Sequence, residues 1–139
     1  MSETVPPPPP IPPATIPVRP REVENLRIFF IVAAIVNGVI TVVWLFSVVV
    51  GGLASCGIGC LLIFIPMITG AACILDIMAI SKVNAPPSAG VSSFLNFAAI
   101  ADIVAGAVGV SLVPLVMGIL SMVFLQKPEV QRYFAQALR

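Results

Sequence analysis

Histidine is absent from this 139-residue sequence, and charged residues make up only 9% of it. Without histidine the chain lacks the commonest metal ligand and the side chain that most often acts as a general base. A soluble domain carries about 25% charged residues, which keep its surface hydrated. Because 59% of this chain is hydrophobic, we expect its outer surface to face lipid. The net charge is +1 with no basic stripe, so the chain also lacks the surface that nucleic acids bind.

Motifs for catalysis and for cofactors are missing as well. No nucleophile has a partner base, and no phosphate-binding loop is present. Three cysteines without histidine do not form a zinc site. Cys56 and Cys60 flank a glycine-rich turn, where they either pair in an oxidising compartment or serve as small apolar residues. We therefore expect no enzyme activity, no cofactor and no metal.

Residues 1–20 are unusually rich in proline, which fixes φ and lacks an amide donor. They are expected to form a disordered, extended cytoplasmic tail. Its PxxP spacings are typical of segments that dock into the aromatic-lined groove of a proline-motif-binding protein. A stiff spacer is the alternative interpretation. The prolines that define these spacings are Pro7, Pro10, Pro13, Pro17 and Pro20.

A long run without formal charge extends from Ile28 to Leu75. One helix crosses the hydrocarbon core with about 20 residues, so this run contains two spans. The glycines between 51 and 60 predict the break between them. We place the spans at about 27–50 and 58–81.

The next segment, Lys82–Gly90, contains two prolines and predicts a loop. A second apolar run follows, with Asp102 as its single charged residue. A turn near 109–112 divides it into spans at about 92–109 and 112–126. A re-entrant hairpin is the alternative for the last span. The sequence thus predicts an all-α integral membrane protein with a four-helix transmembrane domain over 21–126.

Residues 127–139 predict a short amphipathic helix after the last span. Its apolar side chains recur at helical spacing, with charged and amide side chains opposite. A helix of this kind lies in the headgroup plane of the membrane. The apolar stripe consists of Val130, Tyr133, Phe134, Ala137 and Leu138.

The basic residues predict the orientation of the chain. With four spans, all seven lysines and arginines lie on one side of the membrane. The positive-inside rule makes this side cytoplasmic, so both termini are expected there. Three or five spans would scatter these residues over both sides.

An internal repeat predicts that the four spans form two tandem hairpins. Pro66 is followed by Gly70 in the second span, as Pro114 is by Gly118 in the fourth. The first and third spans carry Ala-Ile-Val-Asn37 and Ala-Ile-Ala-Asp102. Such hairpins would be parallel repeats, and chance similarity between apolar segments is the alternative.

Three polar residues, Asn37, Thr69 and Asp102, are expected near the middle of the bilayer, at 1.5 Å of helix per residue. A carboxylate there costs at least about 2.5–3.5 kcal/mol. Asp102 is either a proton or cation site, or a neutral acid that joins helices by bonding to Asn37 or Thr69. The sequence places Asp76 nearer the cytoplasmic end, so no second acid is expected at this depth. That favours the structural role.

Small residues in the third span follow two helical rows. They allow a neighbouring helix to approach closely. This span is therefore expected to be central in the bundle or to lie at an oligomer contact. The small residues are Ala98, Ala101, Ala105, Gly106 and Gly109.

These features favour a non-enzymatic, small polytopic membrane protein. It would be an accessory or structural subunit of a larger membrane complex, or a scaffold that presents its proline-rich tail. The alternative is a minimal channel or a proton- or cation-linked transporter subunit that uses Asp102. The expected partners are the lipid bilayer, other membrane subunits or a second copy, and a cytoplasmic protein that binds proline-rich motifs.

Overall fold

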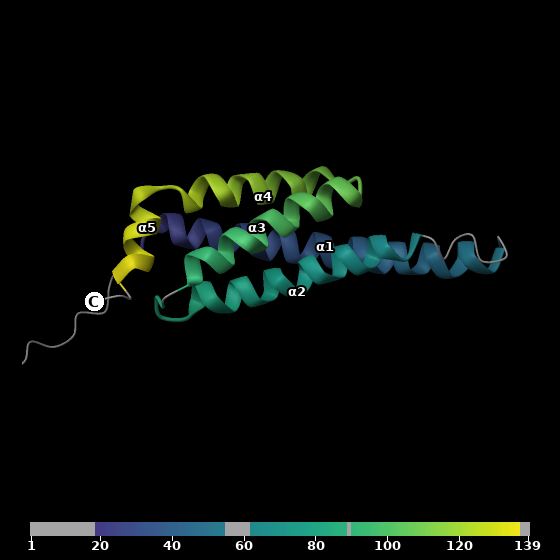
Figure 1. Cartoon of the computed structure of the whole chain (residues 1–139), viewed down its shortest axis with the longest axis horizontal. Helices are drawn as coiled ribbons and strands as arrows, with labels where there is room; N and C mark the ends of the chain where they lie inside the picture. The colour runs from purple at the N-terminus through teal and green to yellow at the C-terminus, as the bar shows by residue number, and fades with distance from the viewer. Residues whose placement is uncertain (1–18, 55–61, 89, 137–139) are drawn as a thin grey trace, which may run out of the picture.

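The computed structural model describes residues 19–54, 62–88 and 90–136, and these residues form helices and short connections without a strand. The predicted all-helical class is confirmed for this part of the chain (Figure 1). Four of the five PxxP prolines, Cys56, Cys60 and the last three residues lie outside the described ranges. The helices are α1 (Arg21–Ala54), α2 (Phe64–Asn84), α3 (Val91–Val108), α4 (Leu112–Leu125) and α5 (Pro128–Ala135).

Three of the described helices, α1, α2 and α3, are long and apolar enough to cross a membrane. The chain is thus a multi-pass membrane protein. Helix α4 has 14 residues, fewer than the roughly 20 of a straight crossing. It is bent by 70° from α5. A fourth crossing therefore depends on this short helix.

The first hairpin differs in its boundaries from the expected spans. Helix α1 continues through Gly51 and Gly52 to Ala54, and α2 begins at Phe64 rather than at 58. A glycine inside a helix costs only about 0.5–1 kcal/mol. In lipid, a backbone N–H or C=O group without a hydrogen-bond partner costs several kcal/mol. The helix therefore continues through the two glycines. Helices α3 and α4 lie within one residue of the expected spans.

The helices are arranged as two hairpins that pack side by side. Helix α1 packs along α2 and α3 along α4, while contacts of α2 with α3 and of α1 with α4 join the hairpins. Helices α1 and α2 extend beyond the turn between α3 and α4 (Figure 1). We call this the loop end. The opposite end, which holds α5 and the start of α1, is the terminal end.

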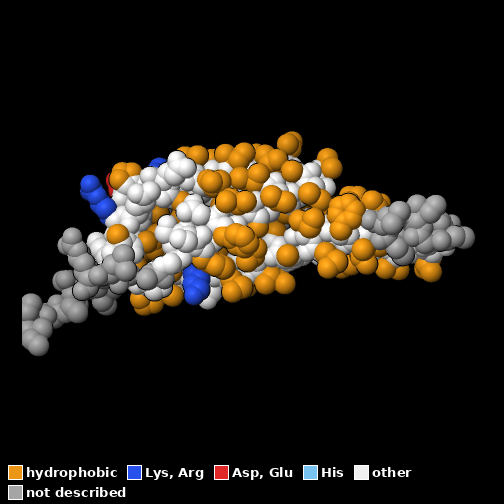
Figure 2. All heavy atoms as spheres, in the orientation of Figure 1, with side chains coloured by type: hydrophobic (Ala, Val, Ile, Leu, Met, Phe, Trp, Pro, Cys, Tyr) orange, Lys and Arg blue, Asp and Glu red, His pale blue; other side chains and the backbone are white. Residues whose placement is uncertain are grey.

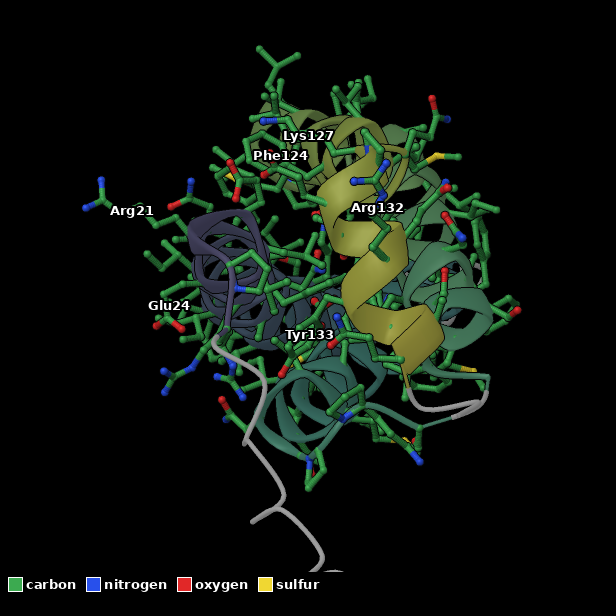
Figure 3. All side chains as sticks on the ribbon, turned by 90° about the vertical axis from the view of Figure 1, so that its left-hand side faces the viewer. Arg21, Glu24, Phe124, Lys127, Arg132 and Tyr133 are labelled. Atoms are coloured by element: carbon green, nitrogen blue, oxygen red, sulfur yellow. The ribbon has the colours of Figure 1, made fainter. Side chains whose placement is uncertain are left out.

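A large part of the apolar core lies at the terminal end, and α5 runs across it (Figure 3). Helix α5 was expected to lie in the headgroup plane, but its apolar stripe packs on this core: Val130, Tyr133 and Phe134 are buried. The bend after α4 turns α5 back over the bundle, so protein covers its stripe. The terminal core comprises Val23, Leu26, Phe30, Ala79, Val83, Val91, Leu95, Ala98, Leu125, Val130, Tyr133 and Phe134.

The outer surface matches a membrane environment. Hydrophobic side chains cover the middle of the molecule, and basic side chains gather near the terminal end (Figure 2). Many large apolar side chains are more than half exposed, Phe46 by 71% and Val42 by 66%. Lipid is the medium in which such exposure has no cost.

Candidate functional site: a buried carboxyl pair

Three helices bring Asn37, Asp76 and Asp102 into one hydrogen-bonded group, which we call the polar cluster. The Nδ2 atom of Asn37 donates to Asp102 Oδ1 at 2.8 Å and to Asp76 Oδ2 at 3.1 Å. All three residues are fully buried, with 0% relative exposure. Two carboxyl groups therefore share one amide nitrogen inside the bundle.

Small residues around the polar cluster make room for these polar groups. Ala72 and Ala79 lie about one turn from Asp76 on the buried face of α2. Helix α4 approaches α3 closely, because a Cβ at Gly118 would lie 3.0 Å from the Cβ of Asp102. Close backbone packing of this kind excludes lipid from the polar cluster.

The hydrogen bonding of the polar cluster is incomplete. Three buried oxygens have no hydrogen-bond partner: Asn37 Oδ1, Asp76 Oδ1 and Asp102 Oδ2. The two carboxyl groups lie close to each other, because both bond to the same Asn37 nitrogen. In the described part of the chain, the two ion pairs are Arg19–Glu24 and Arg27–Glu24. Neither of them involves the carboxyl pair.

Depth along the helices predicted that Asn37 and Asp102 lie at a similar level, and the structure brings them into contact. The prediction missed Asp76. One clue was available in the sequence: Asp76 lies seven residues, about two helical turns, from Thr69 and therefore on the same face of its helix. Its short distance from Lys82 along the helix had suggested the membrane interface instead, but α5 and the terminal core bury that end of the bundle.

Thr69 is buried but is not bonded to either carboxyl group. Its Oγ1 accepts from Thr41 Oγ1 at 2.9 Å and donates to the carbonyl of Ile65 at 3.1 Å. Thr41 Oγ1 also lies 2.7 Å from the carbonyl oxygen of Asn37. The two hydroxyl groups thus form a second polar pair, one turn of α1 further toward the loop end.

The small residues of α3 serve contacts inside the chain. A Cβ at Gly106 would lie 2.5 Å from the amide nitrogen of Leu115, so α3 and α4 touch there through their backbones. Ala98 and Ala105 are also buried, whereas Ala101 and Gly109 are partly exposed. The close approach expected of this span lies within the α3–α4 hairpin.

The polar cluster offers chemistry for a proton or a small monovalent cation. No group of three or more histidine, cysteine or acidic side chains that could hold a metal ion occurs among the residues that the structure describes. Two acids and one amide, all buried, are suited to taking up and releasing one positive charge. No family model, curated protein or solved structure matches this chain, so the polar cluster is the feature that bears most directly on its function.

Proposed function

We propose that this protein is a minimal proton channel or the proton-carrying subunit of a transporter, with Asp76 and Asp102 as the proton-binding groups. The observation that supports this is the double hydrogen bond from Asn37 to two buried carboxyl groups. A single intramembrane acid is readily explained as a helix-to-helix bond. A second acid on the same amide is harder to explain by packing alone.

The chemistry follows from charge and burial. Two carboxylates side by side cannot both remain ionised in a site of low dielectric without a compensating cation. At least one of them therefore holds a proton. That proton would supply a donor to one of the buried oxygens that now lack a partner. Its uptake and release would change the charge inside the membrane, which is the elementary step of proton transport.

A flux assay tests this function. The purified chain is reconstituted into liposomes that contain a pH-sensitive dye, and a pH gradient is applied. We expect proton flux from the native chain and its loss in Asp76→Asn and in Asp102→Asn, which keep the shape but cannot titrate. Glu129→Gln is the matched control, because Glu129 lies in the first turn of α5, away from the polar cluster. Flux that survives in both aspartate variants would refute the proposal, and flux that requires sodium would replace the proton by a cation.

The proposed topology places the termini and all basic residues in the cytoplasm. The described basic residues near the terminal end agree with one-sided placement (Figure 2). In this arrangement α1, α2 and α3 cross the bilayer, and the short α4 returns the chain to the cytoplasmic side where the bilayer is locally thin. The positive-inside rule supports this orientation.

An accessory subunit of a larger membrane complex, or a scaffold that presents its proline-rich tail, is the second candidate. A shallow, largely apolar surface of α1 favours it, formed by Ala34, Ile35, Gly38, Val39, Val42 and Val43. Ala34 and Gly38, at the small-residue spacing of helix contacts, already lie against Cys73 of α2, so a partner would meet the exposed Val39 and Val42. We expect Val42→Trp to remove a membrane partner that co-purifies in mild detergent. Ile74→Trp, on the exposed face of α2, is the control.

A further inference from the structure

The surroundings of the carboxyl pair differ between the two ends of the bundle. This difference determines from which end a proton can reach the carboxyl pair. The inference about the entry route rests on the proposed function, which is proton transport. Polar side chains lie on the loop-end side of the pair. On the terminal side, an apolar core separates the pair from the solvent.

On the loop-end side, Thr41 and Thr69 are the next polar residues. Their hydroxyl groups are 2.9 Å apart, and the Thr41 hydroxyl also contacts the carbonyl of Asn37. The α3–α4 hairpin ends beside them, because a Cβ at Gly109 would lie 3.4 Å from Thr69 Cγ2. Two helical turns, about 10 Å, separate Asp102 from this hairpin turn. The hydroxyl groups offer donors and acceptors to entering water.

On the terminal side, the terminal core fills the space between the helices. Leu26, Phe30 and Leu95 are each 0% exposed. Ser121 is the other buried polar residue among those described, and its hydroxyl has no partner. Beyond this isolated group, α5 closes the end of the bundle (Figure 3). From Asp102 to the start of α3 at Val91 is about 16 Å of helix.

The short α3–α4 hairpin brings the loop-end side closer to the carboxyl pair. Helix α4 is about 21 Å long, whereas the hydrocarbon core is about 30 Å thick. The turn itself is apolar: Val110 is 88% exposed with a positive φ of 52°, and Leu112 is 77% exposed. Turns in water use glycine, asparagine or aspartate at positive φ. An apolar turn suits lipid, and a hairpin shorter than the bilayer thins it locally.

We propose that protons enter the carboxyl pair from the loop end, past the α3–α4 turn and the Thr41–Thr69 hydroxyl pair, while the terminal core blocks the other side. The polar side of the site then faces the end that carries the α1–α2 connection, and Val48 and Ile65 are the buried apolar residues that a proton passes beyond the hydroxyl pair. Release toward the terminal end requires the terminal core to open. Cys73, one turn from Asp76, donates to the carbonyl of Ala34 at 3.4 Å and is the other titratable side chain of α2 in this region.

The test is the rate at which solvent deuterium replaces the proton on the carboxyl pair. The full chain in lipid nanodiscs is transferred to D₂O, and infrared spectroscopy follows the C=O band of the protonated carboxyl. The variant Thr41→Val/Thr69→Val should slow the exchange by about tenfold or more, as a barrier increase of about 1.4 kcal/mol would. Ser121→Ala, on the terminal side, should leave the rate unchanged. Thr69→Ser alone keeps its hydroxyl and should exchange at the native rate.

The proposed entry route and the proposed proton site can be refuted independently of each other. If no protonated carboxyl band is lost on replacing Asp76 and Asp102 by asparagine, the proton site itself is refuted. If the band is present but exchanges at the same rate in the double valine variant, only the entry route is refuted. Slowing by Ser121→Ala instead would place the entry at the terminal end. Should the double variant unfold, Thr69→Val alone, set against Thr69→Ser, gives the same comparison.

Discussion

Asn37 has a special position in the polar cluster, because one side chain serves two acids. Both of its amide hydrogens are used, one toward Asp102 and one toward Asp76. The residue therefore ties α1 to α2 and to α3 at one point. Removing either acid breaks one of these bonds, whereas removing Asn37 breaks both.

Replacing Asn37 by leucine should therefore destabilise the bundle more than Asp102→Asn. Two hydrogen bonds are lost and two buried carboxyl groups keep no donor from α1, at a cost of about 1–3 kcal/mol. Asp102→Asn retains an acceptor and should cost less than about 1 kcal/mol. Unfolding in mixed detergent micelles measures both values. Val39→Leu, at an exposed position of α1, is the control, and equal stability of the leucine and asparagine variants would contradict the double role.

The depth of a residue could be estimated from the sequence only along its own helix. That estimate worked for Asn37 and Asp102, which the structure brings into contact. It failed for Asp76, because burial there depends on the packing of α1 and α3 against α2, which the position of a residue along its own helix does not show. The bend that returns α5 over the core has no sequence signal beyond Pro128.

At the level of helices, the tightest contact is that between α3 and α4. A Cβ at Gly106 would lie 2.5 Å from the Leu115 amide nitrogen and 2.9 Å from its Cα. These are backbone atoms, which cannot rotate away. The small-residue rows of the sequence predicted a close approach, but they did not tell whether the neighbour was α4 or a second chain.

Gly106→Ala should therefore destabilise the hairpin, by the roughly 1–3 kcal/mol typical of overpacking. The same substitution at Gly51 is a matched control, because a Cβ there meets nothing within 4 Å. Gly51→Ala should stabilise α1 by about 0.5–1 kcal/mol through helix propensity. Detergent unfolding of the two variants gives the comparison. Equal effects of both substitutions would show that α3 and α4 do not pack as described.

Arg19 connects the start of α1 to the end of α2. Its guanidinium donates to the carbonyls of Val83 at 2.9 Å and Asn84 at 3.2 Å, and it pairs with Glu24 at 3.7 Å. The last carbonyls of a helix have no partner within the helix, and a cation there also suits the helix dipole.

Arg19→Ala should cost about 0.5–1.5 kcal/mol, the net value of hydrogen bonds at a partly exposed helix end. Arg19→Lys keeps the charge but loses the planar fork, whose Nη2 donates to both carbonyls while Nη1 pairs with Glu24, so it should recover only part of this loss. Hydrogen exchange of the amides at the end of α2 is the measurement. If hydrogen exchange at the end of α2 is unchanged in the alanine variant, Arg19 does not stabilise this end of the helix.

For the whole molecule, the sequence predicted the helical class and the membrane environment well. It predicted the packing between distant segments poorly. Hydrophobic content and charge predicted a helical multi-pass membrane protein, and the structure agrees. The number of crossings is harder to predict, because a 14-residue helix such as α4 crosses only where the bilayer is thin. The equivalent positions of the proposed repeat, Asn37 and Asp102, are joined by a hydrogen bond in the structure.

The orientation of the whole chain leads to the last prediction. In a background without the other cysteines, single cysteines are labelled in intact cells with a membrane-impermeant thiol reagent. Position 56, in the α1–α2 connection, should react from outside, whereas Asn84→Cys and Gln136→Cys should react only after lysis. Both of these lie at the terminal end, where the basic residues gather (Figure 2), and the positive-inside rule assigns that end to the cytoplasm. Labelling of position 84 from outside would overturn this orientation, because the loop between α2 and α3 would then face away from the cytoplasm.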